Sequence, residues 1–164
     1  MKAGKAKPFS APVAADSFAR GLDKPLTAEQ LFRSILVAAG NVGGADGKIA
    51  GKTETELRRA FVAQYPDLFA PEYNATLSQA MFMANSPLTD LLLSPRDGNL
   101  ADRLTKIASP EERVKAAFAA IYGRLPSSDE AEACLAYLKP RAIDAGVKQM
   151  IWALISSAEF SVNH

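Results

Sequence analysis

The first residues that could do chemistry lie in the segment DGKIAGKT, residues 46–53. Its pattern is similar to the phosphate-binding loop G-x-x-x-x-G-K-T, in which the Lys and the Thr contact phosphate and Mg²⁺. Lys52 and Thr53 match those two positions, but Asp46 stands where the first glycine is required. Such a loop must also follow a β-strand, whereas the residues before it predict a helix that ends at Gly40. We therefore expect a glycine-rich turn between helices here.

The same segment partly matches a calcium-binding EF-hand loop. Placing Gly47 at the sixth loop position puts Val42 first, and Gly44 and Thr53 then stand third and twelfth. Only Asp46 could supply a side-chain oxygen, whereas Ca²⁺ requires several carboxylates, including a bidentate one at the end of the loop. A structural turn is again the better interpretation.

The sequence offers few residues that could bind a metal ion or act as an acid or base. The chain has one cysteine, Cys134, and one histidine, His164, so no zinc site and no Cys-His or Ser-His pair can be built. The paired carboxylates fall in first turns of predicted helices, where they complement the helix dipole; they are Glu111, Glu112, Asp129 and Glu130. We expect no catalytic, cofactor-binding or metal-binding residues and no cofactor.

Composition narrows the function classes further. A net charge of +1 over 164 residues gives no support for nucleic-acid binding, which requires a marked basic excess. The apolar stretches are shorter than the roughly 20 residues that a transmembrane helix needs. The lone cysteine excludes an internal disulfide, so cysteine usage does not indicate the compartment.

The elements that must position any site are helical, because capping patterns recur along the chain and strand-like alternation is nearly absent. Capping boxes begin at Thr27, Thr53 and Ser127, and Ser-Pro starts stand at residues 86–87 and 109–110. A further helix is expected from Asn74. Together they predict an all-α bundle of about eight short helices, over residues 22–164, with a sub-boundary suggested near 94–99.

The first 21 residues predict an extended, basic, proline-containing arm. Its residues that could contact a partner are Lys2, Lys5, Lys7 and Phe9. The arm lacks the continuous apolar core of a signal peptide.

The segment AAIYGRLPSSDEAE, residues 119–132, interrupts two helical patterns and is interpreted as a corner. Gly123 supplies a left-handed stop, and Pro126 blocks continuation of the first helix. Ser127 and Glu130 cap the second helix. We expect Arg124 to anchor the turn by pairing with a carboxylate, with Glu159 as the favoured partner.

This corner also carries a family resemblance. The segments RVKAAFAAIYGRLPSSDEAEACLAYL and MIWALISSAEFSVNH resemble the C-terminal end of a planctomycete-type domain of unknown function. The matching residues are Tyr122, Gly123, Arg124, Pro126, Ser127, Glu130, Ser156, Ser157, Glu159, Phe160, Asn163 and His164. With the similar upstream segments PLTAEQLFRSILVAAG and LSQAMFMANSP, the resemblance covers residues 22–164. Residues 113–162 more weakly resemble phycobilisome-linker-like helical domains, which are non-catalytic assembly modules.

The resemblance implies a function without chemistry of its own. The family occurs in large exported proteins, commonly behind a cytochrome-c domain, and has no established catalytic residues, which suggests a periplasmic or cell-surface location. The expected function is a non-catalytic helical interaction or scaffold module that binds protein partners, within a redox or surface complex. One alternative is an accessory subunit of an electron-transfer complex that binds no cofactor, since the haem-attachment pattern C-x-x-C-H is absent. The other is an enzyme with a cleft of carboxylates and Arg124.

Overall fold

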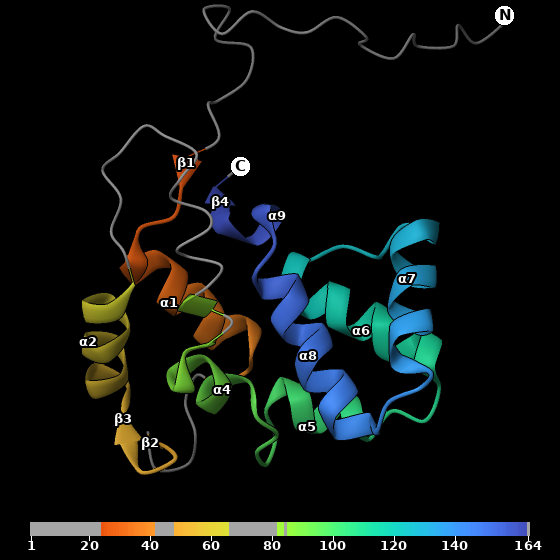
Figure 1. Ribbon diagram of the computed structural model, residues 1–164, viewed down its shortest axis with the longest axis horizontal. Coiled ribbons are helices and arrows are strands. Elements are labelled where there is room, and N and C mark those ends of the chain that lie inside the picture. Colours follow the sequence, from red (N-terminus) through yellow and green to blue (C-terminus); the bar gives the residue numbers. More distant parts are fainter. Residues whose placement is uncertain (1–23, 42–47, 66–81, 84, 164) are drawn as a thin grey trace, which may run out of the picture.

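The computed structural model describes the chain outside residues 1–23, 42–47, 66–81, 84 and 164, and the described part is largely α-helical (Figure 1). This confirms the predicted all-α class. The described helices are α1 (Ala28–Ala38), α2 (Glu54–Gln64), α4 (Pro87–Leu93), α5 (Leu100–Thr105), α6 (Pro110–Tyr122), α7 (Ser128–Leu138), α8 (Ile143–Ile155) and α9 (Ala158–Ser161). The predicted N-terminal arm with Lys2, Lys5, Lys7 and Phe9, and the predicted start of a helix at Asn74, lie outside the described residues.

The helix starts lie where the capping residues predict them. Thr27, Thr53 and Ser127 each form a complete capping box, in which the hydroxyl accepts from the third backbone N–H and the third side chain accepts from the cap's own N–H. Ser86 and Ser109 cap α4 and α6 ahead of the prolines in their first turns. Each box satisfies N–H groups that a helix end would otherwise leave unpaired.

Gly40 lies at the end of α1, where this helix contacts the start of α5. It has a φ of 67°, and the N–H of Asn41 donates to the carbonyl of Leu36 at 2.8 Å, which is the Schellman arrangement. The N–H of Leu100 donates to the carbonyl of Ala39 at 2.9 Å. A Cβ at position 40 would lie 3.1 Å from the Leu100 nitrogen, so both the φ and this close approach require glycine.

One core cluster runs through the described helices, and α8 contacts α4, α5, α6, α7 and α9. In Figure 1, α1, α2 and α4 lie on one side of the molecule, and α5 to α8 lie on the other. Residues 94–99 form a turn in which the Asn99 side chain donates to the Ser94 carbonyl and accepts from the Arg96 N–H. Buried residues on both sides of this turn belong to the same cluster.

Short β-ribbons are the part of the fold that the sequence did not predict. β1 (Lys24–Pro25) pairs antiparallel with β4 (Val162–Asn163), so the two ends of the described chain lie together. β2 (Lys48–Ile49) and β3 (Lys52–Thr53) form a hairpin whose turn residues, Ala50 and Gly51, have φ values of 49° and 80°. These angles match a type I′ turn. Thr53, which matches the threonine of the phosphate-binding pattern, is the N-cap residue of α2.

Two further details differ from the expected elements. The last helical pattern breaks at Ser156, so α8 ends at Ile155 and α9 is a separate turn of helix. Helical spacing in the sequence predicts one apolar face on α7, made of Ala131, Cys134, Leu135 and Leu138. Only Leu138 is buried, because Cys134 and Leu135 border the surface of the bundle.

Candidate functional site

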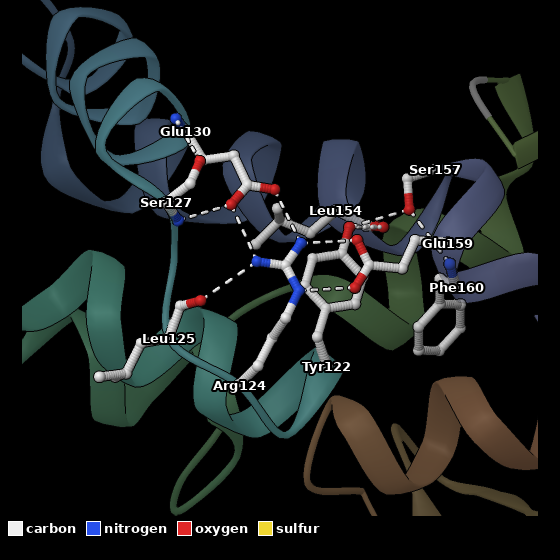
Figure 2. A network of polar contacts seen from close by, with 9 residues as sticks. All are labelled: Tyr122, Arg124, Leu125, Ser127, Glu130, Leu154, Ser157, Glu159 and Phe160. Carbon is white, nitrogen blue, oxygen red and sulfur yellow. Dashed lines mark hydrogen bonds and ion pairs between the residues drawn. The ribbon is translucent and has the colours of Figure 1, made fainter. Parts of the chain in front are cut away.

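The candidate site is built at the corner between α6 and α7. Gly123, with a φ of 70°, ends α6, and its N–H donates to the Ala119 carbonyl at 3.2 Å. This left-handed residue turns the chain so that the next side chain, Arg124, lies between the start of α7 and the short helix α9 (Figure 2). Gly123 thus directs the Arg124 side chain out of α6, and the packing of α7 and α9 beside it supplies two carboxylates.

Arg124 uses all five of its N–H donors in this corner. Its Nε and Nη2 donate to the two carboxylate oxygens of Glu159 at 2.7 and 2.6 Å. Its Nη2 and Nη1 donate to the two oxygens of Glu130 at 2.7 and 2.8 Å, and Nη1 also reaches the Leu125 carbonyl at 3.1 Å. Figure 2 shows the guanidinium held between both carboxylates. The expected Arg124–Glu159 pair is present, and Glu130 is a second partner that extends it to a double bidentate arrangement.

Aromatic rings support the guanidinium from the α6 side. The Arg124 Cζ lies 5.4 Å from the ring centroid of Phe118 and 5.2 Å from that of Tyr122. The two rings contact each other edge to face, with centroids 5.4 Å apart. A cation within about 6 Å of a ring is attracted by the ring's quadrupole. The two aromatic rings and the two carboxylates therefore all stabilise the position of the Arg124 guanidinium.

The hydroxyl of Tyr122 extends the network to the end of α8. It lies 2.8 Å from the Leu154 carbonyl and 2.8 Å from the Ser157 hydroxyl. Since a carbonyl can only accept, the Tyr122 proton goes to Leu154, and the Ser157 hydroxyl donates to the Tyr122 oxygen. Ser157 also accepts from the Phe160 N–H at 3.2 Å, which caps α9. These bonds fix the break between α8 and α9.

The network also shifts the ionisation of its members. The hydrogen bonds from Arg124, followed by the backbone N–H of Ser127, lower the pKa of Glu130 to about 2. The bonds to Glu130 and Glu159 raise the pKa of Arg124. Burial raises the pKa of Tyr122, since a phenolate would lose its hydration there. At neutral pH Glu130 is therefore ionised beside the Arg124 guanidinium, whereas the Tyr122 hydroxyl keeps its proton.

We expect Glu130→Gln to flatten the acid dependence of stability. In the native protein Glu130 stays ionised down to a pKa of about 2, whereas the unfolded chain takes up the proton near 4.5. The depressed pKa therefore stabilises the fold above about pH 4.5, and this stabilisation disappears as the pH falls toward 2. Urea unfolding from pH 2 to 7 should show the variant less stable than the wild type at neutral pH and converging with it at low pH. Glu132→Gln on the same helix is the control, and a parallel offset at all pH values would contradict the linkage.

We expect Arg124→Lys to destabilise the corner although it keeps the charge. An ammonium has three donors and no fork, so it cannot replace two bidentate contacts. The matched control is Arg58→Lys, since Arg58 makes one ion pair, with Glu29 at 2.5 Å. Thermal unfolding should show a drop in Tm several times larger for Arg124→Lys than for Arg58→Lys. Equal changes in Tm would show that the two bidentate contacts of Arg124 add nothing to stability.

A groove of about 440 Å³ adjoins the corner, between α1, α6 and α9. Tyr122 and Glu159 belong to both the corner network and the groove wall. Its apolar lining includes Leu26, Val37, Ala38, Ala120, Ile121 and Phe160. Val37 is 58% exposed, although it is a large apolar side chain on an otherwise amphipathic helix. The rigid corner therefore forms one wall of an open apolar surface, which we call the α1–α9 groove.

The sequence by itself did not predict that Val37 is exposed or that Arg113 is buried. Val37 follows the buried Leu36, and only its position on the polar side of α1 could have singled it out. Arg113 is 7% exposed and donates to the carbonyls of Leu104 and Ile107 at 3.0 and 2.5 Å, beside the C-terminal end of α5. It follows Glu111 and Glu112 in a charged first turn, and no pattern in the sequence singles it out as a buried residue.

In the part of the chain that the structure describes, no cluster of three or more Cys, His, Asp or Glu side chains is placed to hold a metal ion. Within the same residues, every helix is too short or too polar to cross a membrane. Comparison of the chain with models of known protein families, with curated proteins and with solved structures gives no match.

Proposed function

We propose that this chain is a non-catalytic helical interaction module of a larger, extracytoplasmic assembly, and that an apolar segment of a protein partner binds in the α1–α9 groove. The observation that carries the proposal is the exposed Val37 in an apolar groove whose wall is held rigid by the Arg124 network. The extracytoplasmic location rests on the family resemblance alone.

The charges at the groove favour an apolar partner segment. Arg33 lines the groove but pairs with Glu54 at 2.8 Å, and Glu159 pairs with Arg124 at 2.6 Å. Each charge thus has its counter-charge within this chain, and the exposed surface left for a partner is mainly carbon. The centre of a protein interface is depleted in charged residues, so a mainly apolar groove whose charges are already paired favours a protein partner.

The corner itself supports a structural role over a catalytic one. A catalytic Arg124 would need a free N–H to bind an anionic group, and all five of its donors are occupied by Glu130, Glu159 and Leu125. Opening one fork would leave a carboxylate unpaired. The alternative of an accessory subunit of an electron-transfer complex stays a prediction, tested by haem or pigment absorbance in a preparation from the native source.

Site-specific photo-crosslinking tests the proposed interface. The photoreactive residue p-benzoylphenylalanine is placed at Val37, or at Ile143 as the control, in the full chain expressed in its native cells. Ile143 is also a large exposed apolar side chain, with 42% exposure, but it is not among the residues lining the groove. We expect one defined protein adduct from position 37 that is missing from position 143. The proposal is wrong if position 37 gives no adduct or gives the same adducts as position 143.

A further inference from the structure

A second cavity lies between α4, α7 and α8. Its volume is about 720 Å³, within the range of about 300–1,000 Å³ that small-molecule sites occupy. The side chains that line it are mostly apolar, aromatic or sulfur-containing and include Met83, Leu93, Cys134, Tyr137, Trp152 and Leu154. We call it the α4–α8 cavity.

The walls of this cavity are held in place by hydrogen bonds. The indole Nε1 of Trp152 donates to the Met83 carbonyl at 2.9 Å. The hydroxyl of Tyr137 donates to the Gln149 side-chain oxygen. A rigid apolar wall loses little conformational entropy when a ligand binds, which favours affinity.

One buried polar group on the wall has an unusually poor partner. Thr89 is 3% exposed, and within the described part of the chain its hydroxyl reaches only the Sδ of Met83, at 3.9 Å. A thioether is a weak acceptor. A ligand oxygen that accepts this proton would replace a weak bond with a normal one, so Thr89 favours a molecule carrying a carbonyl or ether oxygen.

The charges on the lining favour an uncharged ligand. Lys148 and Asp90 both line the cavity, and they form an ion pair with each other. A charged ligand would lose hydration on entering an apolar cavity and would have to break this pair to find a counter-charge. An uncharged ligand leaves the pair intact.

We propose that the α4–α8 cavity is a binding site for an uncharged, mainly apolar small molecule that accepts a hydrogen bond from Thr89. This site is separate from the α1–α9 groove, so it can be present or absent independently of the proposed interaction module.

Benzophenone is the probe, because it is uncharged, apolar and carries one carbonyl oxygen. Diphenylmethane lacks that oxygen, and 4-benzoylbenzoate adds a charge. The chain's only cysteine lines the cavity, so the rate at which N-ethylmaleimide alkylates Cys134 reports occupancy. Irradiation of bound benzophenone, followed by mass spectrometry, identifies the residues it touches.

We expect benzophenone to slow alkylation of Cys134 severalfold and to crosslink to residues of the α4–α8 cavity. Diphenylmethane should need about a fivefold higher concentration, the factor that one hydrogen bond contributes, and 4-benzoylbenzoate should be weaker than benzophenone. Thr89→Val should remove the difference between benzophenone and diphenylmethane, and Thr89→Ser should restore it. Ala133→Trp, on the lining, should block protection, whereas Ala136→Trp, exposed on the same helix outside the lining, should not.

Several results would overturn the proposal. An unchanged alkylation rate with benzophenone would show that the cavity does not bind such molecules. Tighter binding of 4-benzoylbenzoate would show a site for anions instead. If Thr89→Val unfolds, equal protection by benzophenone and diphenylmethane in the wild type would by itself contradict the role of Thr89.

Discussion

Phe118→Ala is expected to lower the free energy of unfolding by about 3–5 kcal/mol, the usual cost of emptying a buried phenylalanine site. Phe118 is 2% exposed, so the truncation leaves a void that the surrounding helices fill only in part. It also removes the ring that supports both Arg124 and Tyr122, at 5.4 Å from each. Urea denaturation followed by circular dichroism measures the change.

Matched variants separate the core contribution of Phe118 from its contribution to the corner. Phe160→Ala truncates a half-buried phenylalanine beside the same corner, so it should cost clearly less. Phe118→Leu keeps much of the side-chain volume but loses the ring, so it should lower the free energy of unfolding less than Phe118→Ala does. A double-mutant cycle of Phe118→Leu with Arg124→Met should show coupling, because the two side chains are in contact. A cost for Phe118→Ala no larger than that for Phe160→Ala would contradict the packing described here.

Arg113→Met should have the next largest effect, a loss of roughly 2–3 kcal/mol. The side chain is 7% exposed, and it supplies the Leu104 and Ile107 carbonyls with hydrogen bonds next to the C-terminus of α5. Methionine fills a similar volume but donates no proton, so the carbonyls of Leu104 and Ile107 each lose a hydrogen bond from the guanidinium. A positive charge at that end of a helix is also favourable for the helix dipole.

Lys115→Met on the same helix is the control for Arg113→Met. Lys115 is exposed and makes one ion pair with Glu112 at 2.7 Å, an interaction of small net effect. Its removal should therefore change the free energy of unfolding much less than Arg113→Met does. Hydrogen exchange should localise the damage of Arg113→Met to α5. Uniformly unchanged protection of α5 would show that Arg113 does not hold that helix end.

Helix identity was readable from the sequence because capping interactions are local. Thr27 with Gln30, Thr53 with Glu56 and Ser127 with Glu130 are each three residues apart. The bonds that define each start are therefore written in a single short segment. The same locality explains why Gly40 and Gly123 could be assigned as helix ends, since a positive φ is a property of one residue.

The partner of Arg124 was only half predictable. Glu159 lies 35 residues away and Glu130 six, and the sequence alone could not show that one guanidinium serves both. That outcome depends on α9 folding back beside the corner, which the break at Ser156 allows. The position of the break is in turn held by Tyr122, whose hydroxyl bonds to the end of α8.

By itself, the sequence determined the all-α class, the starts of five described helices, the ends of α1 and α6, and the turn at residues 119–132, because each depends on interactions within a few residues. Only the tertiary structure decided that Arg124 is saturated by two carboxylates, that Arg113 is buried and that Val37 is exposed in a groove. These properties depend on which helices pack together, and burial is a sum over neighbours that are distant in the chain. The corner that begins at Gly123 depends on both kinds of interaction. The local backbone geometry of Gly123 directs Arg124, and the packing of a distant segment brings Glu159 to it.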